Sequence, residues 1–158
     1  MRVVVASGKG GTGKTMVATS LALVAAESGP VALVDDDVEA PNAALFLHPV
    51  IAERQPVLQL SPLVDADRCS HSGRCAEVCQ FHAIASLPQT TLVFSELCHG
   101  CGSCTLNCPS GAISEEARTI GTVEIGQAGT VAFGQGVLVV GEAMATPIIR
   151  ALGKESRT

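Results

Sequence analysis

An internal cysteine repeat occupies the middle of this 158-residue chain and constrains its fold more than any other feature. Shifting the sequence by 29 positions places one copy of the repeat on the other. The matched positions are Cys69 with Cys98, Gly73 with Gly102, Cys75 with Cys104, Cys79 with Cys108, Leu63-Val64 with Leu92-Val93, and Ala83-Ile84 with Ala112-Ile113. Repetition at one fixed offset indicates a duplicated structural unit.

The second copy carries a complete run of the bacterial ferredoxin type. Its cysteines follow the spacing C-x2-C-x2-C-x3-C-P, ending at Pro109. Thiolates are soft donors that suit iron–sulfur clusters, and in two-cluster ferredoxins the fourth cysteine of each run binds the other cluster. The spacing therefore predicts two cluster sites that exchange ligands between the copies. A zinc site is the alternative, although zinc usually joins two C-x-x-C pairs across a longer gap.

The first copy lacks one cysteine, because Ser72 stands where the second is expected and Gln80 stands in place of the proline. One predicted site is complete and holds a [4Fe–4S] cluster through Cys79, Cys98, Cys101 and Cys104. The other has only Cys69, Cys75 and Cys108, so we expect a [3Fe–4S] cluster or a labile [4Fe–4S] cluster held by Ser72 or an outside ligand. His71 is a further candidate ligand, and His82 and His99 are given no role.

Composition and charge exclude several other classes. Seven cysteines form an odd number, and a disulfide scaffold needs a secreted context. A signal peptide with an apolar region over Met16–Ala26 is the alternative, but a Gly-rich loop precedes it. The net charge of −5 argues against a nucleic-acid partner. No apolar run approaches the roughly 20 residues of a membrane span, so a cytoplasmic protein without a transmembrane segment is expected.

A phosphate-binding loop is predicted near the N-terminus. The loop comprises Gly8, Lys9, Gly10, Gly11, Thr12, Gly13, Lys14 and Thr15, which satisfy the P-loop pattern. In such a loop, backbone N–H groups cradle phosphate, Lys14 reaches the β and γ phosphates of ATP, and Thr15 binds Mg²⁺. A Gly-rich turn without a ligand is the alternative.

The flanking segments fit a strand–loop–helix–strand unit. We expect a strand over Arg2–Ala6, a helix over Thr15–Glu27 and a second strand over Val31–Val34, paired in parallel through a right-handed crossover. Further along, Ala43–Leu47 forms a helical turn and Pro49–Pro62 is irregular or extended. Short strands with turns are expected over Ile120–Glu142, and a last helix begins at Pro147.

Two sequence segments resemble a known ATPase family. The loop from Lys9 to Thr15 resembles the deviant Walker A motif of the MinD/Mrp/nitrogenase-iron-protein ATPases, and Asp35-Asp36-Asp37-Val38-Glu39-Ala40-Pro41-Asn42 resembles their switch segment. The resemblance implies that Lys9 reaches the nucleotide of a dimer partner, Asp37 positions the attacking water and Asp35 lies near Mg²⁺. A solvated acidic loop at the end of a strand is the alternative for the three aspartates.

From Met1 to about Arg150 the chain resembles MinD-superfamily ATPases that carry an inserted ferredoxin domain. The resemblance implies an α/β fold: an incomplete P-loop parallel-sheet domain over residues 1–62 and 119–158, with an α+β ferredoxin-like 2[4Fe–4S] domain inserted at 63–118. The family's Walker B aspartate has no counterpart, because no Asp follows Asp67. We therefore expect the N-terminal half of a longer protein, with a partial sheet.

The resemblance implies an ATP hydrolase that couples nucleotide state to electron transfer or cluster transfer. Its expected partners are ATP, a redox or cluster-accepting protein and, in the full-length family, a second copy of itself. Two other functions remain open. One is a non-catalytic ferredoxin-type electron carrier, and the other is an iron–sulfur scaffold or carrier. Whether this chain itself is an enzyme stays open as well.

Overall fold

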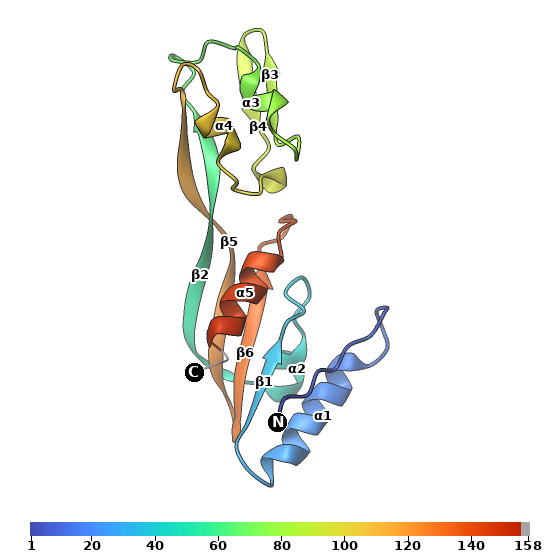
Figure 1. Ribbon diagram of the computed structural model, residues 1–158. Coiled ribbons are helices and arrows are strands. Elements are labelled where there is room, and N and C mark those ends of the chain that lie inside the picture. The colour runs from blue at the N-terminus through green and yellow to red at the C-terminus, as the bar shows by residue number, and fades with distance from the viewer. Residues whose placement is uncertain (156–158) are drawn as a thin grey trace. The chain divides into compact units, whose positions relative to one another are not determined.

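The computed structural model describes residues 1–155, which fold into two compact units (Figure 1). The first unit comprises Met1–Val57, Gly121–Leu138 and the residues from Ala145 onward. The second unit comprises Leu58–Ile120 and Val139–Met144. The chain passes between the units within the two long strands β2 (Val50–Val64) and β5 (Ile113–Ala128), and again at the two ends of the segment Val139–Met144.

A four-stranded sheet of order β1-β6-β5-β2 organises the first unit. Strand β1 (Val31–Asp35) pairs in parallel with β6 (Val131–Leu138), in a register that sets Val31 beside Val131 and Asp35 beside Gln135. Strand β5 is antiparallel to β6. The sheet is therefore mixed: it contains a parallel pair, as a P-loop domain requires, but it is not parallel throughout.

The predicted strand over Arg2–Ala6 is wrong. These residues form no strand and lie mostly exposed, with Val4 79% accessible. A parallel strand needs a hydrogen-bonded neighbour and apolar cover on both faces. Among the described residues β1 takes β6 as its parallel partner instead, so the predicted pairing within the first strand–helix–strand unit is replaced by a pairing with a strand about 100 positions further along the chain.

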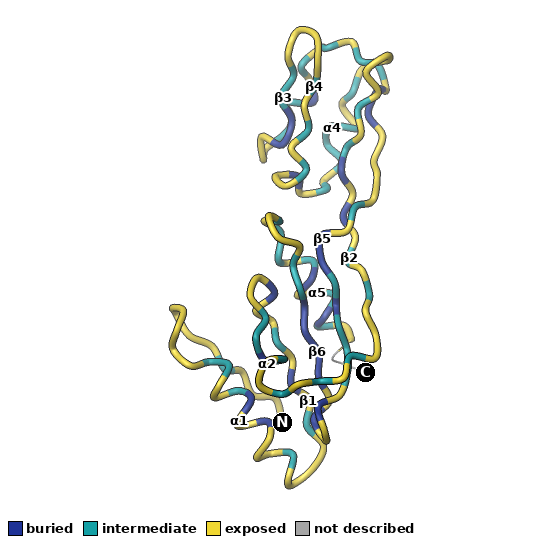
Figure 2. The backbone as a smooth tube through the Cα atoms, turned by 180° about the vertical axis from the view of Figure 1, so that it is seen from behind, coloured by how far each residue is buried: buried dark blue, intermediate teal, exposed yellow. Residues whose placement is uncertain are grey.

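Two helices cover the sheet. Helix α1 (Lys14–Ala26) confirms the predicted helix, and its Ala22 packs with Leu33, Val131 and Phe133. Helix α5 (Thr146–Glu155) confirms the last predicted helix and buries Ile148 and Leu152. The third helix of this unit is the short α2 (Ala43–Leu47), as expected. Much of α1 stays exposed, whereas β6 is largely buried (Figure 2).

The second unit repeats one helical turn at the offset found in the sequence. Helix α3 (Arg74–Glu77) and helix α4 (Ser103–Leu106) occupy matched positions, each after a glycine in the left-handed conformation. A hairpin of β3 (Ile84–Leu87) and β4 (Thr90–Val93) follows α3, and a 3₁₀ turn, η1 (Ser95–Leu97), follows the hairpin.

The core of the second unit is small and rich in sulfur. Cys75, Ile84 and Ile113 are buried together, and Cys104 and Cys108 pack against them. An ion pair between Arg118 and Glu142 attaches the segment 139–144 to this unit, and Arg118 also donates to the Ser95 carbonyl at 2.6 Å. The glutamate side chain is only 6% exposed.

Candidate functional site

The predicted phosphate loop forms a turn that leads directly into α1. Gly13 occupies the position before the helix with φ +84°, a conformation that L side chains rarely adopt. The Thr12 hydroxyl donates to Ser7 Oγ at 2.8 Å, and the Ser7 hydroxyl donates to the Lys9 carbonyl at 2.8 Å. In the described part of the chain no side chain caps the start of α1, so its first N–H groups are available to an anion.

The two lysines of this loop are free to meet a phosphate. Within residues 1–155, neither Lys9 nor Lys14 takes part in an ion pair. Lys9 is exposed and Lys14 is half-buried.

A hydrogen-bond network connects the start of α1 to the end of β1. Thr15 donates to Asn42 Oδ1 at 2.6 Å, and the Asn42 backbone N–H donates to Asp35 Oδ2 at 3.1 Å. Asp35 also accepts N–H bonds from Ala43 at 3.0 Å and from Asp37 at 3.1 Å. The structure thus brings the two predicted Mg²⁺ ligands, Thr15 and Asp35, into one network of oxygen donors, the donor type that Mg²⁺ prefers.

Asn42, which joins these two residues, has no role predicted from the sequence. The sequence feature that could have identified Asn42 is its position directly before the short helix α2, where asparagine is common. The predicted water-positioning residue, Asp37, is exposed, and only its backbone takes part in the network. Burial, and then the charge of Asp35, raise the pKa of the neighbouring Asp36.

At the adjoining parallel strand a buried glutamine is paired through its amide nitrogen, while its buried Oε1 has no hydrogen-bond partner among the described residues. Gln135, in register with Asp35, is buried and donates to Glu124 at 2.6 Å. Glu124 in turn forms an ion pair with Arg54 at 2.8 Å. Strand β6 ends at Leu138, whose N–H donates to the Val38 carbonyl at 2.8 Å. The sequence at the carboxyl end of β6 contains no aspartate.

Four cysteines line one cavity of the second unit, which we call the four-cysteine cavity. They are Cys79, Cys98, Cys101 and Cys104, the set predicted for the complete cluster. Backbone N–H groups donate to two of the sulfurs, from Ala83 to Cys79 at 3.3 Å and from Gly100 to Cys98 at 3.4 Å. Donors aimed at sulfur favour thiolate ligands over thiols.

Gly100 is required where the chain turns at this cavity. Its φ is +64°, and a Cβ there would lie 2.9 Å from the Leu60 carbonyl oxygen. The left-handed turn thus brings the backbone against β2 with no room for a side chain.

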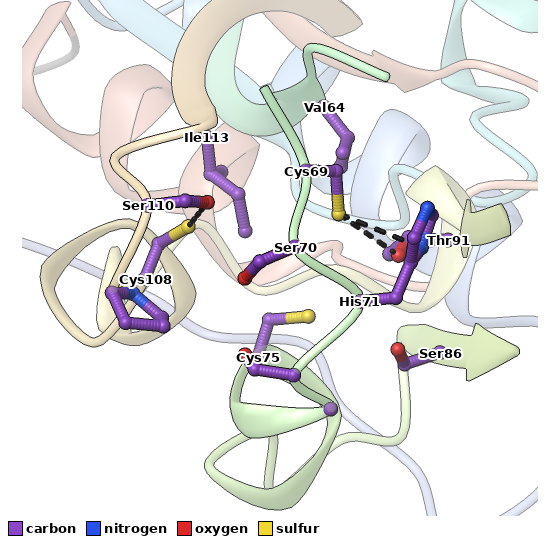
Figure 3. Close-up of a pocket in the computed structure, with 13 residues that line it drawn as sticks. Val64, Cys69, Ser70, His71, Cys75, Ser86, Thr91, Cys108, Ser110 and Ile113 are labelled. Atoms are coloured by element: carbon purple, nitrogen blue, oxygen red, sulfur yellow. Dashed lines mark hydrogen bonds between the residues drawn. The ribbon is translucent and has the colours of Figure 1, made fainter. Parts of the chain in front are cut away.

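The remaining three cysteines line a separate cavity, the three-cysteine cavity. Cys69, Cys75 and Cys108 reach it from different segments, with Ser110 against Cys108 and with His71 and Thr91 against Cys69 (Figure 3). The distances to Cys69 Sγ are 3.6 Å from Thr91 Oγ1 and 3.8 Å from His71 Nδ1.

The two cavities share a repeated backbone contact. The Ala112 N–H donates to Cys108 Sγ at 3.3 Å, which repeats the contact of Ala83 with Cys79. Both contacts fall at the last cysteine of a run.

The thiols differ in their ease of ionisation. Burial raises the pKa of Cys75 and of Cys104. The Ser103 hydroxyl lowers the pKa of Cys101. At Cys108 burial acts upward, but the Ser110 hydroxyl and backbone N–H groups outweigh it and lower the pKa. A bound metal favours the thiolate at every one of these positions, so metal binding would release protons.

The donor set fits iron–sulfur clusters. All seven cysteines are free of disulfides. Within residues 1–155, no three His, Cys, Asp or Glu side chains converge closely enough to hold a single metal ion. The thiolates of a cluster bind different irons, so they surround a volume instead of meeting at one point. Sulfur donors arranged around a cavity agree with that requirement.

Comparison with known proteins identifies the family. The chain matches the model of the CobQ/CobB/MinD/ParA nucleotide binding domain over residues 3–151, and it belongs to this family. The phosphate loop lies within this nucleotide-binding domain.

Two curated relatives come from Methanocaldococcus jannaschii. The uncharacterized protein MJ0578 is 36% identical over 84 residues, which are 53% of this chain and 30% of that protein. The uncharacterized protein MJ0579 is 26% identical over 144 residues, which are 90% of this chain and 49% of that protein. The matched part of this chain thus covers at most about half the length of these relatives. None of the helices in residues 1–155 has the length and apolar character needed to cross a membrane.

Proposed function

We propose that this chain binds Mg·ATP at its phosphate loop, holds two iron–sulfur clusters in its cysteine cavities, and couples the nucleotide state to the transfer of electrons or clusters to a protein partner. One observation carries the iron–sulfur part. The seven cysteines separate into two cavities, and the last cysteine of each run lines the cavity of the other run. This exchange is the arrangement expected of two-cluster ferredoxins.

The four-cysteine cavity would hold a [4Fe–4S] cluster, and the three-cysteine cavity a cluster that is one thiolate short. When bound, such clusters accept and release single electrons. The protein supplies thiolates, and the N–H groups of Ala83, Gly100 and Ala112 stabilise their charge. We propose that residues 63–118 are a ferredoxin-like insert within a nucleotide-binding domain made of residues 1–62 and 119–158.

At the nucleotide site, each of the loop residues has a distinct task. The loop N–H groups from Gly8 to Thr15 would bind phosphate oxygens, and Lys14 would neutralise the β and γ phosphates. The Thr15 hydroxyl would bind Mg²⁺ directly, and the Asp35 carboxylate would lie near the ion. Asp37 would orient the attacking water, and Lys9 would reach the nucleotide bound by a second copy of the chain. Hydrolysis and this dimer are parts of the proposal.

The coupling is tested on anaerobically reconstituted protein. The midpoint potential of each cluster and the rate of ATP hydrolysis are measured with Mg·ATP, with Mg·ADP and without nucleotide. We expect Mg·ATP to shift at least one potential and to be hydrolysed in the wild type. Both effects should be lost in Lys14→Ala and kept in the control Lys154→Ala. Midpoint potentials that stay unchanged when ATP is demonstrably bound would contradict the coupling.

A second function, electron transfer without ATP hydrolysis, is favoured by one observation. The carboxyl end of β6 presents no aspartate that could hold Mg²⁺ through water. Normal reduction and oxidation of both clusters in Lys14→Ala, together with no hydrolysis by the wild type, would favour this function.

A further inference from the structure

The two cysteine cavities are lined differently at positions matched by the repeat. Phe81 and His99 line the four-cysteine cavity, with ring centroids 3.6 Å apart and planes only 5° from parallel. Their counterparts 29 residues away are Ser110 and Ser70, and both line the three-cysteine cavity. One cavity is therefore bordered by a stacked pair of rings, and the other by two small hydroxyl side chains.

The serine-lined cavity is also the one that lacks a thiolate. Ser72 stands at the position of Cys101 and lines the same cavity, where both Ser72 and Ser70 are exposed. A four-iron cluster bound by Cys69, Cys75 and Cys108 would leave one iron without sulfur from the protein. That iron would lie on the side of the exposed Ser70 and Ser72 and not against buried side chains.

His71 is placed against another ligand. Its backbone has φ +51°, close to the +64° of the matched Gly100, so the loop keeps the same turn in both copies. Its Nδ1 lies 3.8 Å from Cys69 Sγ, and Figure 3 shows the ring beside that sulfur. Two ligands of different irons in a cluster stand further apart than this. The imidazole is thus positioned to hydrogen-bond the Cys69 sulfur and not to bind a separate iron.

We propose that the three-cysteine cavity holds a four-iron cluster whose thiolate-free iron binds a small external thiolate, which enters past Ser70, Ser72 and Ser110. This inference rests on the proposed binding of iron–sulfur clusters. The bound cluster would supply an iron that takes the sulfur of the deprotonated thiol as its outside ligand; the proton would go to solvent, and no electron would be transferred. Thiolate is the ligand class that iron in a cluster prefers.

The test uses the reconstituted 158-residue chain after removal of free thiols. Iron and acid-labile sulfide are counted first, and an absence of clusters at this stage would refute the proposed function itself. The reduced protein is then titrated with 2-mercaptoethanol, and its electron paramagnetic resonance spectrum is recorded. We expect a saturable change in the signal of one cluster in the wild type. We expect the same change in the control Ser20→Ala, an exposed serine of α1 outside both cavities.

Two variants separate the missing ligand from the access route. Ser72→Cys supplies the fourth thiolate and should abolish the response while keeping the iron count. Ser110→Phe copies the side chain that borders the other cavity and should raise the half-saturating thiol concentration about tenfold.

Three results would overturn the inference. They are a wild-type spectrum that ignores the thiol, a Ser72→Cys variant that responds like the wild type, and a three-iron cluster that persists after ferrous iron is added to the reduced protein.

Discussion

The carboxylate of Asp35 organises the segment that follows β1, and its removal should destabilise the first unit. It accepts two partly buried N–H bonds, from Asn42 at 3.1 Å and Ala43 at 3.0 Å, and one exposed bond from Asp37. Hydrogen bonds to a charged group contribute about 1.5–3 kcal/mol each, and loss of a helix cap costs about 0.5–2 kcal/mol. Relief of repulsion with Asp36 offsets part of the loss. We therefore expect Asp35→Ala to lower the free energy of unfolding by about 2–3 kcal/mol.

The assay is urea unfolding of nucleotide-free protein followed by far-ultraviolet circular dichroism. Helices α1 and α5, of 13 and 10 residues, dominate the helical signal and belong to the first unit. With a slope of about 2 kcal/mol/M, the midpoint should fall by about 1–1.5 M. The control is Asp37→Ala, whose carboxylate is exposed and should contribute less than about 0.5 kcal/mol. Equal midpoints for the two variants would refute the capping role of Asp35.

Three further predictions address charge, backbone and ion pairing. Asp36→Asn should raise the urea midpoint slightly at pH 7, because the raised pKa of Asp36 in the folded state means that its ionisation disfavours folding. Below about pH 3.8 the carboxyl is protonated in both states, and the substitution should have no such effect. Equal effects at both pH values would contradict this prediction. Gly100→Ala should destabilise anaerobically purified protein by more than Gly73→Ala, since both glycines are left-handed but only Gly100 has no room for a Cβ. The measurement is the reactivity of the cysteine thiols as urea unfolds the protein. In the same assay, Glu142→Ala should cost about 3 kcal/mol, because it removes the carboxylate partner of Arg118 and leaves that charge only its hydrogen bond to the Ser95 carbonyl. Wild-type stability of this variant would show that the ion pair is unimportant.

Local sequence signals predicted some elements well. The Ala- and Leu-rich segment of α1 and the start of α5 at Thr146 confirm expectations based on helix propensity and capping. The cysteine repeat predicted equivalent local structure, and the structure places α3 and α4 at matched positions. These features depend on residues close together in the chain.

Features set by distant pairing were missed. The run Arg2–Ala6 has strand propensity but no partner in the sheet, so it does not form a strand. The segment 120–142 forms parts of the two strands β5 and β6, which pair with each other over eight positions. Local turn signals in the sequence do not predict this pairing. The contact of Thr15 with Asn42 joins residues 27 positions apart, which no local pattern encodes.

The most direct test of the account is the assignment of Cys79, which belongs to the first run but lines the cavity of the second. Iron, sulfide and electron paramagnetic resonance spectra are measured for Cys79→Ser and Cys108→Ser. The account predicts that Cys79→Ser perturbs the cluster bound by Cys98, Cys101 and Cys104 and leaves the thiol-responsive cluster intact, with the reverse for Cys108→Ser. Perturbation of the thiol-responsive cluster by Cys79→Ser, or wild-type zinc in place of iron and sulfide, would contradict it.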